Sequence, residues 1–438
     1  LIKHLASTNW GADKSTLRSL YLGYTRSIMD YNIVLQNICS TSTKQSLDKV
    51  QNQALRLICG GMRSSPTAAC EISANIEPLE LRRKKAALEL YERAKRMDPK
   101  HPCRGLVDKW KCVARLQQKS VLHVVKDLKE HHHLPENRQE MHKVIRELPP
   151  HRNLKSPEIR KTLLGNQNKE SDPTSLKLSA LETIDQYPKD WIHVYTDGSA
   201  FKATVNAGYG ATIQYPEGGK DELSAPCGSF CSNFVAEKKA IIKSINHITE
   251  AFNNVQRNTA GIVLFTDSLS ALQSLESGEM GNKDISELKI AIDHLITTHK
   301  VRITLQWIPG HQGIKGNEQA DVLAKHGASL PQPEVPVSYD TVTKMIRSNI
   351  KEEWLTDWSK NSTRRALYEF MDAPKPKDPI NTLKRQEQSL IFRLRTGHIP
   401  LNSKYIESRK TTLHSVHFVV PQMRQWNIIY STAIGLMN

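Results

Sequence analysis

Residues 194–199 read Val-Tyr-Thr-Asp-Gly-Ser, and residues 264–268 read Leu-Phe-Thr-Asp-Ser. Each stretch is a short apolar run that is typical of a buried strand, and each ends at an aspartate, Asp197 or Asp267. Open α/β sheets keep their ligand crevice at the carboxyl ends of the strands, so neighbouring strands would bring the two carboxylates together. Taken alone, either aspartate would more often be a turn residue or a helix cap than a ligand.

The residues around these two stretches alternate between strand-like and helix-like patterns. Three consecutive strands followed by strand–helix alternation predict an α/β domain, a mixed five-stranded sheet flanked by helices. We expect strands near 191–197, 207–215, 221–227, 261–267 and 301–308, and helices near 232–252, 268–277, 285–298 and 317–329.

Two further acids fall on helix faces that should pack against this sheet. Glu237 lies in line with Ile241 and Ile245, and Asp321 lies in line with Ala324. A carboxylate that faces a sheet is unfavourable unless it is paired or bound to a metal. Four acids aimed at one place would repel one another unless cations joined them, and oxygen-only ligands favour Mg²⁺ or Mn²⁺.

A glycine-rich loop, residues 308–316, connects the last predicted strand to the last helix. His311 stands at its tip. A histidine in a loop is most often simply solvated, but here the glycines would let it approach the four acids.

These motifs together resemble the type 1 ribonuclease H family in their order and spacing. They are YTDGS at 195–199, AE at 236–237, FTDS at 265–268, WIPGH at 307–311 and GNEQAD at 316–321. The resemblance covers about a third of the chain. It implies a metal-dependent endonuclease that hydrolyses the RNA strand of RNA/DNA hybrids and leaves 5′-phosphate and 3′-hydroxyl ends.

The resemblance also implies a role for individual residues. Two Mg²⁺ ions, for which Mn²⁺ could substitute, would be bridged by Asp197; one would activate the attacking water and the other would stabilise the leaving 3′ oxygen. His311 would assist proton transfer or product release, and Ser199 and Asn233 would contact the hybrid. The implied metal ligands are Asp197, Glu237, Asp267 and Asp321.

The rest of the chain divides into segments of different character. Residues 1–112 predict a helical bundle, 113–188 a charged linker, 189–330 the α/β domain, and 331–438 a helical segment with an unassigned tail. The expected helices outside the α/β domain are 14–32, 42–59, 78–97, 339–370 and 386–395. A basic cluster, Arg82 to Lys85, lies on the third of them.

The flanks resemble segments of non-LTR retrotransposon reverse transcriptases. Residues 17–32, 47–56 and 78–83 are similar to the region downstream of the polymerase core, and RLRTGH at 393–398 to the stretch that follows ribonuclease H. There is no cysteine after Cys231 to form the metal knuckle expected next, and no Tyr-x-Asp-Asp motif. The resemblance therefore implies a polyprotein fragment without DNA synthesis.

The formal net charge of +16 is unevenly distributed. Residues 1–120 contribute +11 and residues 331–438 contribute +6, whereas residues 190–330 carry −3. Basic flanks fit a nucleic acid partner, because cations that neutralise phosphates release counterions, although an ordinary solvated surface has the same composition. Some cellular members of the ribonuclease H family bind substrate through a lysine-rich insertion between the positions of Asp267 and the last strand. This sequence has no such insertion, which favours the basic flanks as the substrate-binding segments.

Other residues indicate the compartment. The seven cysteines contain no Cys-x-x-Cys pair, which favours reduced thiols over disulfides or a zinc site. His131-His132-His133 is either a metal site or a solvated run. No apolar stretch is long enough for a membrane span or a signal peptide, so we expect a soluble, intracellular protein of the nucleus or cytoplasm that has no membrane partner.

Three functions remain open at this point. The complete set of acids favours an active nuclease. The missing polymerase motif and altered tail instead suit a catalytically decayed retroelement remnant that binds nucleic acid. An integrase or transposase nuclease on the same fold is disfavoured by the Gly-His loop ten residues before Asp321.

Overall fold

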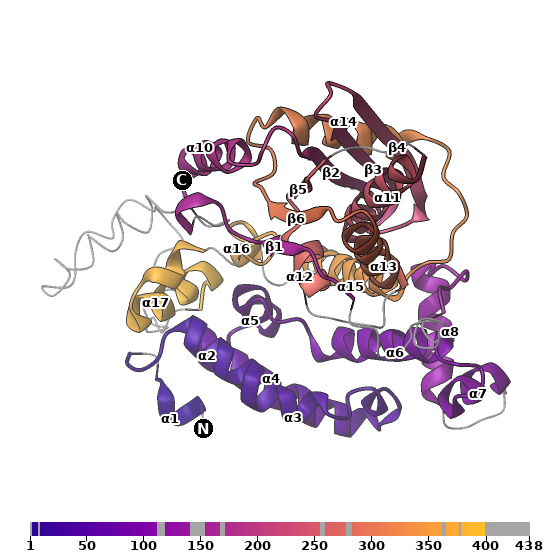
Figure 1. The fold of residues 1–438 in the computed structure, drawn as a ribbon. Coiled ribbons are helices and arrows are strands. Elements are labelled where there is room, and N and C mark those ends of the chain that lie inside the picture. The colour runs from indigo at the N-terminus through magenta and orange to yellow at the C-terminus, as the bar shows by residue number, and fades with distance from the viewer. Residues whose placement is uncertain are drawn as a thin grey trace, which may run out of the picture. The chain divides into compact units, whose positions relative to one another are not determined.

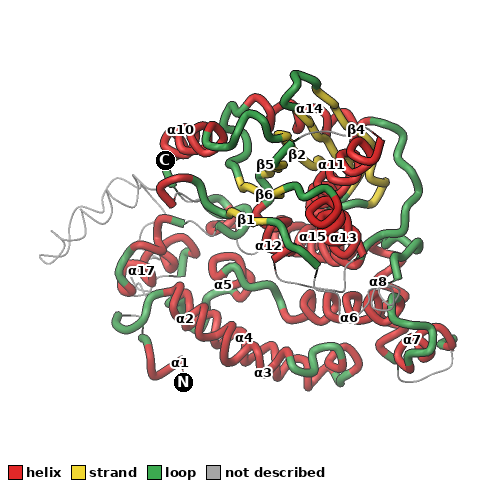
Figure 2. Tube along the Cα trace, in the orientation of Figure 1, coloured by secondary structure: helices red, strands yellow, loops and turns green. Residues whose placement is uncertain are grey.

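The computed structural model describes residues 2–7, 9–111, 119–140, 154–166, 171–254, 259–276, 283–360, 365–375 and 378–398. Along the chain they form two compact units. The sheet unit comprises the described residues of 91–111 and 133–346, and the six strands found among the described residues all lie in it, drawn in yellow in Figure 2. The helical unit comprises the described residues of 1–90, 112–132 and 347–438.

The sheet has the strand order β1-β6-β5-β2-β3-β4. Strands β1, β6, β5 and β2 are parallel, whereas β3 pairs antiparallel with β2 and β4. The expected fold class, a mixed sheet flanked by helices, is therefore confirmed. The strands are β1 Glu158–Arg160, β2 Ile192–Phe201, β3 Val205–Gln214, β4 Lys220–Phe230, β5 Gly261–Thr266 and β6 Arg302–Trp307.

The number of strands differs from the expectation of five. The sixth strand, β1, comes from the segment that we expected to be a linker, and it pairs with Thr304–Gln306 of β6. A strand of three residues with charged ends is too short to show the alternation of apolar and polar residues that predicts a strand. Only its pairing with β6 identifies it as one. The division of the chain at 112, 188 and 330 stays a prediction.

Helices cover both faces of the sheet (Figure 1). Helices α11 (Asn233–Asn254) and α13 (Lys283–Thr298) pack together on one face, and α14 (Lys315–Ser329) packs on the other. Glycines in β3 allow this close approach, because a β-carbon at Gly210 would lie 2.2 Å from the carbonyl oxygen of Ala320. The backbone of α14 therefore rests directly on the sheet.

The core of the sheet unit follows from the apolar strands. All six residues of β5 are buried, as expected for a central strand with helices on both faces. The largest buried side chains include Trp307, Phe265 and Ile213. Packing around β5 holds the neighbouring strand ends, and hence the residues that follow them, in fixed positions.

The helical unit has its own core, built on α4 (Thr41–Cys59). Leu55 and Ile58 of this helix are fully buried. The hydroxyl oxygen of Ser40 accepts a hydrogen bond from the Thr43 amide at the start of α4, and Gly60, at φ 67°, ends the helix. These caps match the predicted helix near 42–59.

The other elements confirm the helical expectations for both flanks, with α2, the π-helix η1 and α3 together forming the expected helix near 14–32. None of the helices in the described parts of the chain is long and apolar enough to cross a bilayer. Cys112 and the tail beyond residue 398 lie outside the described residues. The remaining elements are α1 Ile2–Leu5, α2 Lys14–Leu20, η1 Tyr21–Arg26, α3 Ser27–Asp30, η2 Leu35–Ile38, α5 Thr67–Ala74, α6 Leu79–Lys95, α7 Pro102–Lys109, α8 Val121–His132, η3 Leu164–Asn166, α10 Pro173–Asp185, α12 Leu269–Glu276, α15 Tyr339–Lys360, α16 Arg365–Tyr368, η5 Pro379–Thr382 and α17 Arg385–Thr396.

Candidate active site

The pairing of β2 with β5 brings two of the predicted acids side by side. Thr196 of β2 is in register with Thr266 of β5, so the next residues along the two segments are Asp197, still in β2, and Asp267, the residue that follows β5. Asp197 also pairs with Gly210 of β3, whose α-carbon faces α14. Its side chain therefore points to the α14 face of the sheet. Contrary to our expectation, Asp197 lies inside β2, which continues to Phe201.

Glu237 reaches the same place from α11. Its carboxylate accepts hydrogen bonds from Asn233 Nδ2 at 2.9 Å and from the hydroxyl of Ser268. The helix can come this close because residue 198 is a glycine, and a β-carbon there would lie 2.3 Å from the Glu237 amide nitrogen. Strand β2 and helix α11 are thus in backbone contact next to Asp197.

Asp321 completes the group from α14 on the other face. Its Oδ2 accepts a hydrogen bond from Lys325 Nζ at 2.6 Å, one helical turn further along. The Lys325 side chain is 61% exposed, so the ammonium group stays in contact with solvent. Hydrogen bonding to Asp321 raises the pKa of Lys325, and the charge of Asp197 adds to this effect.

The electrostatics of the group link Asp197 to the other three acids. Burial, followed by the negative charges of Asp267, Asp321 and Glu237, raises the pKa of Asp197 to about 8. Burial also raises the pKa of Glu237, and the charge of Asp267 adds to it, whereas the bonds from Ser268 and Asn233 oppose it. With its pKa at about 8, Asp197 holds a proton at neutral pH when no cation is bound, whereas an ordinary aspartate is ionised there.

The loop between β6 and α14 passes over Asp267. A β-carbon at Gly310 would lie 2.2 Å from Asp267 Oδ2, and Trp307 Nε1 donates to the Asp267 carbonyl oxygen at 3.3 Å. His311 follows at once, with its side chain exposed and a left-handed backbone at φ 54°. The structure thus holds His311 one residue beyond a position in contact with Asp267.

The two predicted substrate-contacting residues have different surroundings. Ser199 is half-buried in β2, paired with Gly208 of β3. Asn233 is the first residue of α11 and already donates to Glu237. The structure therefore brings Asn233 into the carboxylate group, whereas Ser199 lies two residues further along β2 than Asp197.

Three residues of the site were not recognised in the sequence. Ser268 and Lys325 bond directly to two of the acids, and the charge of Lys344 partly offsets the rise in the pKa of Glu237. Lys325 could have been found, because it follows Asp321 at the i,i+4 spacing of a helical ion pair. Lys344 belongs to α15, 107 positions away from Glu237 in the chain, and no local pattern connects them.

The donor set fits hard divalent cations. All four side chains offer carboxylate oxygens, the ligand type that Mg²⁺ and Mn²⁺ prefer. Burial and, after it, the charges of the three neighbouring carboxylates raise the pKa of Asp197, so the protein itself compensates the negative charge of the site only in part. Divalent cations would supply the missing compensation.

A second group of possible metal ligands lies in the helical unit. His131, His132 and Glu353 present ligand atoms within 4.8 Å of one another. The His132 side chain is only 6% exposed, so of the two alternatives the solvated run does not describe this residue. Lys84 Nζ donates to Glu353 at 2.7 Å, however, and an ammonium group beside the carboxylate disfavours a metal ion there.

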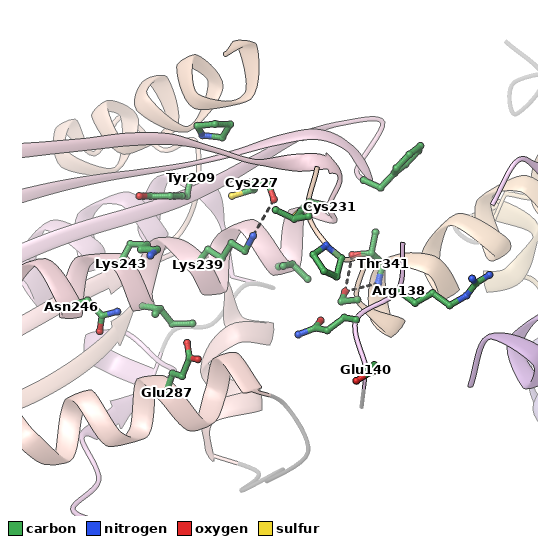
Figure 3. A pocket seen from close by; sticks show the side chains of 18 residues that line it. Arg138, Glu140, Tyr209, Cys227, Cys231, Lys239, Lys243, Asn246, Glu287 and Thr341 are labelled. Atoms are coloured by element: carbon green, nitrogen blue, oxygen red, sulfur yellow. Dashed lines mark hydrogen bonds between the residues drawn. The ribbon is translucent and has the colours of Figure 1, made fainter. Parts of the chain in front are cut away.

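A hollow of about 630 Å³ in the sheet unit contains none of the four acids. Figure 3 shows Lys239, Lys243 and Asn246 of α11 on one side of it and Glu287 of α13 on another. Lys239 Nζ donates to the carbonyl oxygen of Cys227 at 3.0 Å. With acidic and basic side chains both present, this hollow indicates no particular ligand.

Comparison with known proteins agrees with the geometry of the site. Residues 189–329, which include all four acids, match the family model described as RNase H. Ribonuclease HI of Haemophilus influenzae (strain ATCC 51907 / DSM 11121 / KW20 / Rd) is 31% identical over 151 residues, which cover 33% of this chain and 93% of that protein. Ribonuclease H of Saccharomyces cerevisiae (strain ATCC 204508 / S288c) is 31% identical over 191 residues, 38% of this chain and 53% of that protein.

Solved structures of RNase H1 proteins are also similar to about a third of the chain. RNase H1 from Halobacterium salinarum NRC-1 is 22% identical, with a TM-score of 0.25, over 31% of this chain and 96% of that one. LC11-RNase H1, solved in complex with an RNA/DNA hybrid, is 20% identical, with a TM-score of 0.26, over 32% and 99%. The sequence matches carry the assignment: through residues 189–329, this chain belongs to the ribonuclease H family.

Proposed function

We propose that the chain is a metal-dependent endonuclease that hydrolyses the RNA strand of RNA/DNA hybrids. The observation that carries this proposal is the convergence of Asp197, Glu237, Asp267 and Asp321 from two strands and two helices, with the pKa of Asp197 raised to about 8. Strongly perturbed acids that converge in a protein are typical of sites that do chemistry. The family membership of residues 189–329 supports the same reaction.

The four carboxylates would hold two Mg²⁺ ions, and Mn²⁺ could replace them. When bound, the ions would polarise the phosphodiester and make a water molecule more acidic. Asp197 is suited to the shared position, because the charges of all three other acids act on it. The 2′-hydroxyl of the substrate would distinguish the RNA strand from the DNA strand.

Neighbouring side chains would prepare the carboxylates for this task. Asn233 and Ser268 donate to the two oxygens of Glu237 and so fix the orientation of its carboxylate. Lys325 holds Asp321 while its ammonium remains in solvent, free to give way to a cation. Precise orientation of ligands by such partners tunes metal affinity in proteins.

His311 would move protons at this site. Its exposed imidazole lies next to Gly310, the residue in contact with Asp267, and the two ring nitrogens of imidazole can donate and accept protons. Proton transfer to the departing 3′ oxygen, or release of the product, would then depend on this side chain. Ser199 and Asn233 would contact the backbone of the hybrid.

The segments that flank residues 189–330 support a proposal about the kind of gene that encodes the chain. Residues 47–56, 78–83 and 393–398 resemble the segments around ribonuclease H in non-LTR retrotransposon reverse transcriptases, and we infer a fragment of such a polyprotein. The basic flanks would contact nucleic acid. The alternative, a decayed remnant that binds nucleic acid without cleaving it, is disfavoured by the intact set of four acids.

An assay on three duplexes tests the proposal. The full chain is incubated with Mg²⁺ and an end-labelled RNA/DNA hybrid, RNA/RNA duplex or DNA/DNA duplex. We expect cleavage of the hybrid alone, in its RNA strand, with 5′-phosphate ends, and loss of cleavage in EDTA. Binding of the hybrid without any cleavage would instead identify a decayed remnant.

A further inference from the structure

The basic cluster of α6 offers little free charge. Each of its four cations forms an ion pair with at least one carboxylate inside the helical unit, so the face that the sequence suggested for a polyanion is already neutralised. The pairs are Arg82 with Asp30 and Glu77, Arg83 with Asp48, Lys84 with Glu80 and Glu353, and Lys85 with Glu77.

A different surface of the helical unit retains its positive charge. A hollow of about 440 Å³ is lined by four cations, two amides and no acid. We call it the basic hollow. The residues used below are Lys3, Lys49, Asn52, Gln53, Arg56 and Arg63.

Helical spacing explains why α4 can form one wall of the basic hollow. Lys49, Asn52, Gln53 and Arg56 follow the i, i+3, i+4, i+7 pattern and so share one stripe of the helix. Buried residues of α4, among them Leu55, occupy the opposite stripe and fill the core. The helix is therefore amphipathic, with a cationic and amide-bearing outer face.

The cations of the basic hollow are free to bind an anion. Lys3, Lys49 and Arg63 are exposed, and none forms an ion pair with a described residue. Arg56 is held by neutral acceptors, since its guanidinium donates to the carbonyl oxygens of Ser65 and Asn52 and to the hydroxyl of Thr67. These bonds orient its charge without cancelling it.

Two more arginines add to the positive field at the end of α4. Arg385 donates to the carbonyl oxygens of Leu57 and Ile58, and Arg393 donates to that of Gly60 at 2.9 Å. Their acceptors carry only the partial charge of a helix end. The carboxyl end of α4 is therefore surrounded by guanidinium groups with no carboxylate among their partners here.

We propose that the basic hollow is a second nucleic acid contact, which binds the phosphodiester backbone apart from the catalytic carboxylates. Lys49 and Arg56 are about 10 Å apart along α4, which spans about three phosphates of one duplex strand. The amides of Asn52 and Gln53 between them can bond to sugars or bases. This inference rests on the proposed function only in taking nucleic acid as the partner. The position of the contact is inferred from the geometry of the basic hollow.

The mixed charge elsewhere strengthens this choice. The hollow drawn in Figure 3 contains Glu140 and Glu287 beside its lysines, so a phosphate chain would be repelled as well as attracted there. The basic hollow has cations from three separate segments and no opposing acid. An extended polyanion matches that pattern better than a single phosphate does.

The test compares two triple variants of the full chain. Lys3→Gln/Lys49→Gln/Arg63→Gln removes the unpaired charges, whereas Lys95→Gln/Arg104→Gln/Lys119→Gln removes three charges that are paired with Asp108 or Asp127. Binding of a fluorescent RNA/DNA hybrid is measured in EDTA, so that cleavage is not needed. Circular dichroism and the Tm verify that both variants fold, and Lys49→Arg keeps the charge.

We expect the first variant to bind the hybrid about tenfold or more weakly at about 0.1 M salt, with the slope of log K against log salt reduced by about two to three. The control variant should lose less than about threefold, and Lys49→Arg should bind like the parent. Equal losses in both triple variants, or none in the first, would overturn the proposal. So would a loss of binding to phosphatidylserine vesicles with hybrid binding unchanged.

This result is separable from the proposed function. If the first variant loses affinity but neither it nor the parent cleaves the hybrid in Mg²⁺, the basic hollow stands and the nuclease proposal fails. If the parent cleaves the hybrid and the first variant binds it as tightly as the parent, the nuclease proposal stands and the basic hollow fails as a nucleic acid contact.

Discussion

Gly198 of β2 and Glu237 of α11 touch through their backbones, because a β-carbon at residue 198 would lie only 2.3 Å from the Glu237 amide nitrogen. The same β-carbon would lie 2.7 Å from the carbonyl carbon of Ala236. Neither backbone atom can move without moving the whole helix. The glycine next to Asp197 therefore determines how closely Glu237 approaches the other acids.

Gly198→Ala should disrupt both the fold and the site. The added methyl forces α11 away from β2, so we expect a loss of about 1–3 kcal/mol in stability and a raised Mg²⁺ requirement for cleavage. Thermal unfolding and a Mg²⁺ titration of hybrid cleavage measure the two effects. Gly105→Ala is the matched control, since a β-carbon at residue 105 in α7 meets nothing within 4 Å. Equal behaviour of the two variants would contradict this account of Gly198.

Lys325 should compete with Mg²⁺ for Asp321. Its ammonium bonds to Oδ2 at 2.6 Å, so Lys325→Gln leaves Asp321 more available to a divalent ion. We expect half-maximal cleavage at a lower Mg²⁺ concentration, by about twofold to fivefold, as for an exposed ion pair. Lys220→Gln, which removes the partner of Glu222 on β4, serves as the control. A higher Mg²⁺ requirement in Lys325→Gln would show that the lysine assists the site instead.

Protons should compete with Mg²⁺ at Asp197. Burial and the neighbouring acids raise its pKa to about 8 from an ordinary value of 3.8, so the metal-free folded chain holds a proton there that the unfolded chain has lost. Stability without Mg²⁺ therefore falls as the pH rises from about 4 towards 8. Below about pH 8, Mg²⁺ must displace the proton, and its affinity should increase up to about tenfold per pH unit.

Calorimetric Mg²⁺ titrations between about pH 6 and pH 8 measure this linkage. The rise in Tm on adding Mg²⁺ should be larger at the higher pH. In Asp197→Asn, which cannot ionise at this position, the part of the pH dependence due to Asp197 should disappear. Mg²⁺ affinity that is independent of pH in the wild-type chain would refute the competition.

In the helical unit, Glu77 should be a main contributor to acid sensitivity. Burial favours its protonation, but ion pairs with Lys85, Arg26 and Arg82 outweigh burial and lower its pKa. Its stabilisation is therefore present above about pH 4.5 and lost as the pH falls through the lowered pKa. Glu77→Gln should cost about 1.5–3 kcal/mol at neutral pH and flatten the acid limb of a Tm–pH curve. Glu80→Gln, at a side chain 73% exposed, should change neither.

Much of the sheet unit was predictable because its signals are local. The apolar runs that precede Asp197 and Asp267 predict strands, and strand pairing then fixes the two residues side by side. Glu237 and Asp321 are recognisable because a charge stands in an apolar or small-residue stripe. Each inference needs only the period of a helix or strand and the rule that buried charges need partners.

What could not be predicted depends on residues far apart in the chain. Strand β1 is defined by its pairing with β6, about 140 positions later, since its own three residues carry no pattern. The basic cluster of α6 looked available, but Asp30, Asp48 and Glu353 neutralise it from other segments. Charge along the sequence therefore predicted a polyanion-binding flank but not the surface on which the free charge lies.

The most direct test of the central claim is single-turnover cleavage of an RNA/DNA hybrid in Mg²⁺ by Asp197→Asn and Asp267→Asn. Asp221→Asn is the control, because that carboxylate on β4 bonds to Tyr215, which follows β3, and to His247 of α11, away from the four acids. The account predicts a loss of at least about a hundredfold in rate for the first two variants, with the fold retained, and a near wild-type rate for the third. Wild-type-like cleavage by either Asp197→Asn or Asp267→Asn would contradict it.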